Sequence, residues 1–286
     1  MNYLIIGADG FIGGYLYCEL AKTGSVVGTT RNHRRVSKNL LLYDMSSNPL
    51  SFFEDPFRSE SNKTAIICAA FSSINQCHEE YEVAYLVNVV NTIKTIAFLV
   101  ENGYHVIFLS SDNVFDGKKG FYTEEDVPEP INDYGKMKHI VEEYLNNFPS
   151  DVCILRLCKV VGKNNSPKDL FYNWKTEAQK KQTIRCVRDS FLSPVFIGDI
   201  LSAIVTLSQK EATGIFHLGG AKRYNRTELC KLFLDSVGIK ANIEECSVSD
   251  IEIIDGWPID TSLVSEKIAC IGLQTHNIED YFYIYS

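Results

Sequence analysis

The first predicted strand of this chain runs directly into a glycine turn. The N-terminal stretch reads "YLIIGADGFIGGYLYCEL", in which Gly7, Gly10 and Gly13 form a GxxGxxG pattern between an apolar strand and a helix. The first glycine allows a sharp exit from the strand, the second lets the backbone approach a pyrophosphate, and the third lets the helix pack closely on the strand. The N–H groups that begin such a helix bind phosphate. The pattern therefore predicts a dinucleotide-binding unit.

Short apolar runs then alternate with longer amphipathic stretches along the chain. The runs are "SVVGTT", "NLLLYD", "TAIICAA", "HVIFLS" and "VCILRL". Strands that alternate with helices in this way form a parallel sheet buried on both faces. The predicted fold is α/β, a Rossmann-type doubly wound parallel sheet with a small C-terminal substrate-binding lobe. The pattern loosens after residue 160, which predicts a Rossmann domain at 1–159 and 196–219 and a lobe at 160–195 and 220–286.

The longest predicted helix covers about residues 79–101. Tyr85, Val89, Ile93 and Val100 recur there at a helical period, which predicts one apolar stripe.

Composition and charge exclude several classes of protein. The net charge of -8 argues against a nucleic-acid or polyanion binder. The sequence shows neither a signal peptide nor a run near the roughly 20 apolar residues that cross a bilayer, so a cytoplasmic protein without a membrane partner is expected. The nine cysteines include no CxxC pair and the six histidines no metal spacing, which predicts reduced thiols and no bound metal.

The end of the second strand indicates which dinucleotide binds. Enzymes that use NAD carry an acid there, which accepts a hydrogen bond from the ribose 2′-hydroxyl. This chain reads "TTRNHRR", with Arg31 at that place. A guanidinium suits a 2′-phosphate, so the sequence favours NADP(H), with NADH as the alternative cofactor. The competing interpretation is that Arg31 belongs to a solvated loop.

Two further motifs supply chemistry. The strand "HVIFLS" ends in "SSDNVFDG", and the next predicted helix begins with "YGKMK", which places Tyr134 and Lys138 on one helical face. A free tyrosine titrates near pH 10, and a neighbouring ammonium and an oxidised nicotinamide favour its phenolate form. A serine hydroxyl at the strand end holds the substrate oxygen beside the phenol. Ser111 is the predicted active hydroxyl, while Ser110 has an alternative role in turn chemistry.

These motifs, in this order, resemble the extended short-chain dehydrogenase/reductase superfamily, and more narrowly its dTDP-4-dehydrorhamnose reductase branch. The carrying segments are "GADGFIG", "SSDNVFDG" and "YGKMK", with "CAAF", Asn88 in "YLVNVVNT" and "DSFLSPVFIGDI" as further matches. The resemblance covers most of residues 1–220 and is thin afterwards. It implies Ser111, Tyr134 and Lys138 as the catalytic residues.

The resemblance and the motifs together give the predicted binding residues. The cofactor-binding residues are Gly7, Asp9, Gly10, Phe11, Ile12, Arg31, Asp44, Met45, Ala69, Ala70, Phe71, Tyr134 and Lys138. The substrate-binding residues are Ser111, Asp112, Asn113, Lys159 and Arg223.

The chain also departs from the branch. Asn113 stands where the branch has a tyrosine, and Lys159 stands where the rhamnose enzyme tends to have a tryptophan against the sugar. Arg223 is expected either to reach the substrate diphosphate or to lie on a surface helix. These departures leave the particular sugar and nucleotide open.

The expected function is NADPH-dependent reduction of the C4 carbonyl of a nucleotide-diphosphate-linked 4-keto-6-deoxy sugar, in deoxysugar biosynthesis. The first alternative is an epimerase or dehydratase of the same superfamily; dehydratases often carry Asp-Glu after the catalytic hydroxyl, where this chain has Asp112-Asn113. The second is a non-catalytic NADP-binding regulatory subunit, such as that of methionine adenosyltransferase. A homodimer and a monomer are both compatible with the sequence.

Overall fold

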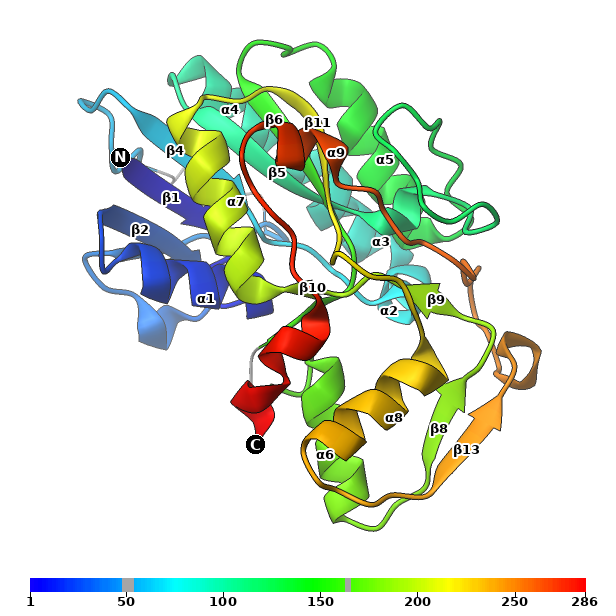
Figure 1. The fold of residues 1–286 in the computed structure, drawn as a ribbon. Helices are drawn as coiled ribbons and strands as arrows, with labels where there is room; N and C mark the ends of the chain where they lie inside the picture. The colour runs from blue at the N-terminus through cyan, green and yellow to red at the C-terminus, as the bar shows by residue number, and fades with distance from the viewer. Residues whose placement is uncertain (48–53, 163–165) are drawn as a thin grey trace. The chain divides into compact units, whose positions relative to one another are not determined.

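A seven-stranded sheet forms the centre of the structure, a computed structural model that describes residues 1–47, 54–162 and 166–286. Its strands lie in the order β11-β6-β5-β4-β1-β2-β3 (Figure 1). The pairs β1–β2, β1–β4, β2–β3 and β4–β5 are all parallel. The strand order reverses between β1 and β4, as in a doubly wound Rossmann fold, which confirms the predicted fold class. The strands are β1 (Asn2–Ile6), β2 (Ser25–Thr30), β3 (Leu40–Leu42), β4 (Lys63–Ile67), β5 (His105–Ser111), β6 (Val152–Leu157) and β11 (Gly214–Leu218).

The chain forms two compact units. The first comprises Met1–Ser111, Asn132–Leu155 and Ala203–Phe216, and the second Asp112–Ile131, Arg156–Ser202 and His217–Ser286. The predicted domains, 1–159 with 196–219 and 160–195 with 220–286, differ from these units at 112–131, 156–159, 196–202 and 217–219. Their assignment to cofactor and substrate stays a prediction. Residues 163–165 of the predicted lobe lie outside the described residues.

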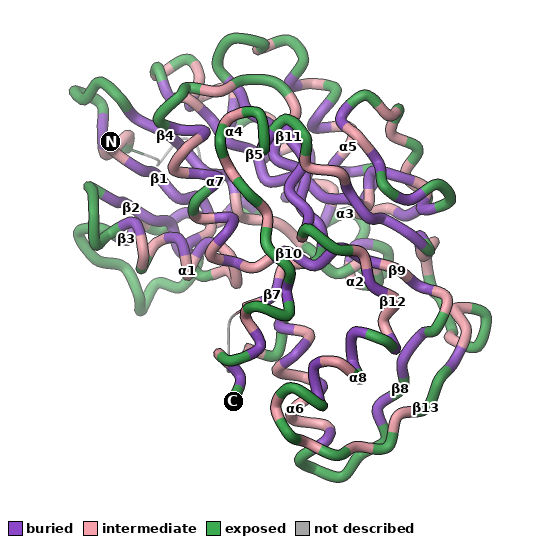
Figure 2. The backbone as a smooth tube through the Cα atoms, viewed as in Figure 1, coloured by how far each residue is buried: buried purple, intermediate pink, exposed green. Residues whose placement is uncertain are grey.

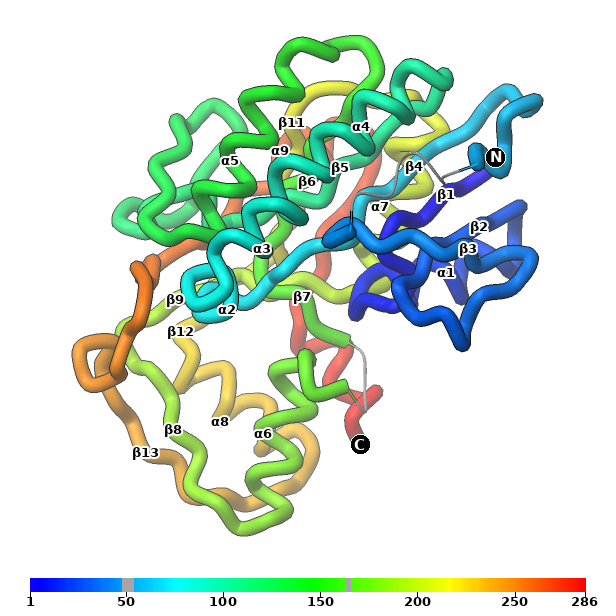
Figure 3. The backbone as a smooth tube through the Cα atoms, turned by 180° about the vertical axis from the view of Figure 1, so that it is seen from behind, coloured from blue at the N-terminus to red at the C-terminus, as the bar shows by residue number. Residues whose placement is uncertain are grey.

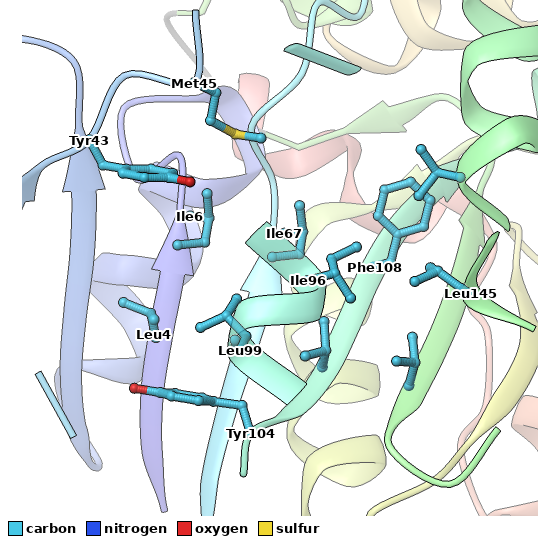
Figure 4. Close-up of a cluster of buried hydrophobic side chains, with 14 of the residues drawn as sticks. Leu4, Ile6, Tyr43, Met45, Ile67, Ile96, Leu99, Tyr104, Phe108 and Leu145 are labelled. Atoms are coloured by element: carbon cyan, nitrogen blue, oxygen red, sulfur yellow. The ribbon is translucent and has the colours of Figure 1, made fainter. Parts of the chain in front are cut away.

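The core of the first unit lies between the sheet and the helices that follow β4 and β5. Figure 3 shows α4 (Thr92–Glu101) and α5 (Asp133–Leu145) across the strands. Leu4, Ile67 and Phe108 of the sheet pack there with Ile96 and Leu99 of α4 (Figure 4). Figure 2 shows the central strands as buried along most of their length. Strands buried on both faces explain the continuous apolar runs in the sequence.

One long helical segment, 81–101, departs from α-helical geometry in its middle. It consists of α3 (Tyr81–Tyr85), a π-helix η3 (Leu86–Asn91) and α4, after the short α2 (Ile74–Glu79). The π-turn shifts the period, so Ile96 and Leu99 are fully buried whereas Tyr85 and Val100 of the predicted stripe are only partly buried. Val89 of the predicted stripe is buried, and Tyr85, Ile93 and Val100 pack against the core, so the stripe faces the core although the π-turn changes its spacing.

The same segment, Tyr81–Glu101, is long and apolar enough to cross a membrane by length and composition alone, with a mean hydropathy of 1.7. The sequence-based prediction is instead that no stretch is apolar enough to cross a bilayer. About half of its most apolar part is buried inside the protein, where Val87, Ile96 and Leu99 join the core. The core helix of a soluble protein and a membrane span share these features, so this helix is weak evidence for a membrane.

The second unit packs two helices against a small parallel sheet. In Figure 1, α6 (Leu170–Gln179) and α8 (Arg226–Ser236) lie beside β8 (Ile184–Val187) and β13 (Ile243–Cys246). Phe171 of α6 and Phe233 of α8 stack with their ring centres 4.8 Å apart. The Phe282 ring of η6 (Ile278–Tyr285) meets both of them edge-on. The C-terminal η6 therefore belongs to the core of this unit, a role that the sequence did not reveal.

The remaining elements of the described chain are α1 (Phe11–Leu20), η1 (His33–Arg35), η4 (Asp112–Val114), β7 (Val160–Val161), β9 (Phe191–Leu192), β10 (Val195–Phe196), α7 (Ile197–Gln209), β12 (Tyr224–Asn225), η5 (Val248–Asp250) and α9 (Glu266–Cys270).

All nine cysteines are free, as the sequence predicts. Burial raises the pKa of the Cys68 thiol to about 12, so this thiol is neutral at physiological pH.

We expect Phe282→Ala to destabilise the second unit by about 3–5 kcal/mol, because it leaves a cavity against the stacked rings of Phe171 and Phe233. Urea unfolding followed by tryptophan fluorescence measures the effect, since both tryptophans, Trp174 and Trp257, belong to this unit. Tyr283→Ala is the matched control, because Tyr283 is on the same helix and 70% exposed. Equal transitions for the two variants would contradict a core role for η6.

Candidate active site

The glycine turn after β1 is built by close backbone packing. Gly7 has a φ of 94°, a conformation that favours glycine. A Cβ atom on Gly13 would lie 2.2 Å from the carbonyl oxygen of Gly7, so only glycine lets α1 approach the end of β1 this closely. The Gly7 N–H donates to the Thr29 hydroxyl at 2.9 Å, which ties the turn to β2. These contacts match the roles that the sequence predicts for Gly7 and Gly13.

The start of α1 fits a dinucleotide phosphate. Gly10 is its N-cap residue and offers no side chain to cap the helix, while Phe11 and Ile12 form its first turn. A helix N-terminus without a side-chain cap leaves backbone donors and the positive end of the helix dipole for an anion. The contacts of Gly10, Phe11 and Ile12 with a cofactor stay predictions.

Charged side chains surround the end of β2. Asp9 accepts hydrogen bonds from the Thr30 hydroxyl and from the Arg35 guanidinium, with which it forms an ion pair. Arg31 follows Thr30 directly and is exposed. The Asp9 carboxylate is thus engaged within the protein, and Arg31 is an exposed basic group directly after β2; its contact with a 2′-phosphate stays a prediction.

Two asparagines of the π-helix hold the loops that follow β3 and β4. The Asn88 amide accepts from the Phe71 N–H at 2.9 Å and donates to the Phe71 carbonyl at 3.0 Å. Asn91 donates to the Met45 carbonyl at 2.5 Å. The side chain of Met45 lies in the core (Figure 4), and Asp44 accepts from the Ser46 N–H.

The same loops lie at the edge of the sheet where β1 ends. The Ala69 N–H donates to the Ile6 carbonyl at 2.9 Å, and Ala70 lies between Ala69 and Phe71 in the same loop. All the predicted cofactor-binding residues therefore follow strand ends or lie on α1 and α5, within the first unit.

The predicted catalytic residues lie at the end of β5 and on α5. Ser111 is the last residue of β5 and is buried, and Tyr134 and Lys138 lie on α5, whose N-cap residue Asn132 accepts from the Gly135 N–H at 2.8 Å. The Lys138 Nζ atom lies 5.9 Å from the centre of the Tyr134 ring. The same ammonium donates to the Leu109 carbonyl at 2.8 Å, which fixes it to β5 just before the serines.

The Lys138 ammonium is buried, and this changes its acidity. Burial lowers the pKa of Lys138 from its usual value near 10.5 to about 8, while the Glu142 carboxylate opposes the shift. The Nζ atom also lies 4.6 Å from the centre of the Phe108 ring, a cation–π contact. At neutral pH the ammonium form therefore predominates next to Tyr134.

The predicted substrate-binding residues other than Ser111 belong to the second unit. The Asp112 carboxylate accepts from the Thr261 hydroxyl at 2.6 Å and from the Asn113 amide at 2.9 Å. The Arg223 guanidinium forms an ion pair with Asp260 at 2.7 Å and stacks on the Phe191 ring at 3.8 Å. Asp112, Asn113 and Arg223 are thus engaged within their own unit, and their contacts with a substrate stay predictions.

Lys159 differs from these three residues. Its side chain is exposed. Desolvation and the nearby positive charge of Arg226 lower the pKa of Lys159, while the carboxylates of Asp169 and Asp112 oppose this shift. The Arg226 guanidinium lies 5.4 Å from the centre of the Trp257 ring, and its Nε atom is buried without a hydrogen-bond partner in the described part of the chain. Lys159 and Arg226 are therefore two cations close enough to influence each other, with Asp112 acting on both.

Two residues of the site were missed by the sequence analysis. The Asn91 side chain donates a hydrogen bond to the Met45 carbonyl, and the only signal for this in the sequence is that Asn91 follows Asn88 by three residues. Glu142, a buried carboxylate on α5, accepts from the Ser110 hydroxyl at 2.5 Å. An acidic residue four positions after Lys138, on the same face of a helix that the sequence predicts to pack on the sheet, was the available signal.

Comparison with known proteins agrees with this architecture. The chain belongs to the RmlD substrate binding domain family, which matches residues 1–277. It is 25% identical to a probable low-salt glycan biosynthesis reductase of Haloferax volcanii over 279 residues, which covers 94% of this chain and 93% of the relative. It is 27% identical to a dTDP-4-dehydrorhamnose reductase of Salmonella typhimurium over 226 residues, which covers 76% of this chain and 72% of the relative.

A solved structure shows the same fold. A dTDP-4-dehydrorhamnose reductase of Bacillus anthracis, in complex with NADP, superposes with a TM-score of 0.86 at 21% identity and covers 100% of both chains. The predicted family and the predicted class, an NAD(P)-dependent oxidoreductase, are confirmed.

We expect Arg31→Asp to raise the dissociation constant of NADPH by at least about tenfold and to change that of NADH little, because a carboxylate repels the 2′-phosphate. Titrations of both cofactors, followed by their fluorescence, give the two constants. Arg34→Asp is the control, since Arg34 is also exposed and lies three residues away. An unchanged NADPH-to-NADH ratio in Arg31→Asp would assign this arginine to the solvated loop.

Proposed function

We propose that this protein is an NADPH-dependent reductase that reduces the C4 carbonyl of a nucleotide-diphosphate-linked 4-keto-6-deoxy sugar. The observation that carries the proposal is the buried Lys138 ammonium, fixed to the Leu109 carbonyl and 5.9 Å from the Tyr134 ring. A cation held beside a phenol at the end of a parallel strand suits proton transfer to a developing alkoxide. The reductase names of its relatives support the same reaction.

The cofactor would lie along the edge formed by the glycine turn, the 44–45 loop and the 69–71 loop. The close approach of α1 to Gly7 and the uncapped start of that helix suit its pyrophosphate. Arg31 would bind the 2′-phosphate. When bound, NADPH supplies the hydride that goes to the sugar C4 carbon.

Residues of this chain handle the oxygen of the reacting carbonyl. The Ser111 hydroxyl donates a hydrogen bond to it and holds it near Tyr134. The Tyr134 phenol donates a proton to the same oxygen as the C–H bond forms. The Lys138 ammonium stabilises the phenolate that remains until solvent returns a proton.

The second unit would bind the nucleotide diphosphate and the sugar. Lys159 and Arg226 are the basic pair suited to an anionic part of the substrate, because Lys159 is exposed and the two positive charges influence each other. Lys159 also replaces the branch's tryptophan, so we expect a sugar or nucleotide different from that of the rhamnose enzyme. We further propose that the protein is cytoplasmic, binds neither nucleic acid nor a membrane, binds no metal, and works as a monomer or homodimer.

The two alternatives each lack a supporting feature. A dehydratase needs a further acid/base pair, and the residues after Ser111 are Asp112 and Asn113, without the glutamate. A regulatory subunit has no need for a serine, a tyrosine and a buried lysine arranged for proton transfer.

The test of the function is a panel of dTDP-, UDP-, GDP- and CDP-linked 4-keto-6-deoxy sugars, with NADPH or NADH, followed by the loss of reduced-cofactor absorbance. We expect NADPH-dependent turnover of at least one member. If no member reacts while NADPH still binds tightly, the reductase function is wrong and the regulatory subunit becomes the better interpretation.

We expect Tyr134→Phe to lower kcat by about 10²–10⁴-fold, because the phenylalanine ring cannot donate a proton, while NADPH affinity is largely kept. Steady-state kinetics and NADPH titration measure the two effects. Tyr144→Phe on the same helix is the control and should retain normal turnover. Near-normal turnover of Tyr134→Phe would remove this residue from its proposed role.

A further inference from the structure

A buried carboxylate lies on the same helix as the catalytic pair. Glu142 is 3% exposed and Lys138 is 4% exposed, and Glu142 follows Lys138 by four residues, which places both side chains on one face of α5. A buried glutamate is rare in proteins unless hydrogen bonds or an opposite charge compensate the loss of water. Its presence at this position therefore needs a partner.

The first partner of Glu142 comes from the strand that carries the active serine. The Ser110 hydroxyl donates to the Glu142 carboxylate at 2.5 Å, a charge-assisted hydrogen bond. Ser110 directly precedes Ser111, and the Lys138 ammonium is bound to the carbonyl of the residue before Ser110. Glu142 and Lys138 thus each attach α5 to the final residues of β5.

Glu142 also interacts electrostatically with the positive charge of Lys138. The groups that influence Lys138 are Glu142 on its own helix, Cys68 after β4 and Cys77 on α2. The Cys68 thiol is neutral, because burial raises its pKa to about 12. Glu142 is the one carboxylate among these three groups. Its negative charge raises the pKa of Lys138, whereas burial lowers it. His139 faces Glu142 from the same helix, with 4.0 Å between Nδ1 and Oε2.

We propose that Glu142 is a positioning residue for the reaction: through Ser110 and through its negative charge, it keeps Lys138 protonated and fixed at the end of β5 beside Tyr134. The inference rests on the proposed function, since the ammonium stabilises the phenolate left by proton transfer. Ser110 thereby has its own role, which is to hold Glu142, and Ser111 is left to the substrate.

The experiment compares the wild type with Glu142→Gln. Lysine labelled with ¹³C at Cε is titrated by NMR between about pH 6 and pH 10, and the Lys138 signal is identified by its loss in Lys138→Met. The pH profile of kcat/KM is measured with the sugar nucleotide that the panel identifies. The pKa of Lys138 is about 8 in the wild type, so the rate should fall above that pH as the ammonium is lost.

We expect Glu142→Gln to move both the Lys138 titration and the fall in rate to lower pH by about one unit, because the opposing negative charge is gone. The matched control is Glu143→Gln, which removes the same charge from the next residue, a side chain 65% exposed to solvent. This control should titrate as the wild type does, since water screens its charge. An unshifted Lys138 in Glu142→Gln, or an equal shift in Glu143→Gln, would overturn the proposal.

A second variant covers the case in which Glu142→Gln does not fold. The double variant Ser110→Ala/Glu142→Met replaces both hydrogen-bonding partners by apolar groups, which a core tolerates better than the loss of one. It should show the same shift of the Lys138 titration. If the wild type reduces no sugar nucleotide but Lys138 shifts as expected, the proposed function fails and the coupling of Glu142 to Lys138 stands. If turnover is present and neither variant shifts Lys138, the coupling fails and the function stands.

Discussion

The parallel pairing of β1 with both β2 and β4 is the constraint on which the rest of the structure depends. Parallel strands end at one edge of a sheet, so every connection that leaves this edge is brought to the same place. The glycine turn follows β1, the basic segment follows β2, and the loop held by Asn88 follows β4. β5 continues the edge with Ser110 and Ser111. The predicted site is therefore built from strand ends, and the helices behind the sheet hold those ends.

A second constraint acts on charge. Lys138 lies in an environment that disfavours its ammonium, yet the proposed reaction needs that ammonium next to a phenol. The protein meets this need with a carbonyl, an aromatic ring and a carboxylate, each contributed by β5 or α5. A solvent-exposed lysine would keep its proton more easily, but water would screen its effect on Tyr134. Burial with a compensating acid gives both a charged lysine and a strong local field.

The sequence predicts the sheet well, because parallel strands depend on local patterns, and it predicts which elements carry Ser111, Tyr134 and Lys138; their catalytic roles stay predictions. The alternation of apolar runs specifies parallel strands, and the order of the glycine turn, the serine pair and the YxxxK helix specifies where the chemistry lies. Contacts between distant residues were not predictable in this way. Ser110 and Glu142 are 32 positions apart, and nothing in either local pattern names the other. The aromatic residues of η6 likewise gave no period, since their partners lie on α6 and α8.

The π-helix has a consequence for how the chain tolerates changes of length. A π-turn absorbs one residue more than an α-helical turn, so α3 and α4 keep facing the core on either side of it. Removing one residue within η3 would leave both flanking helices in register, whereas the same deletion within α4 would rotate everything after it by about 100°. The deletion in η3 would instead disturb the two asparagines that secure the Met45 and Phe71 loops. The extra residue of the π-turn thus serves the loops at the edge of the sheet rather than the packing of the core. A deletion there would shorten the helix only at the cost of a hydrogen bond to one of these loops.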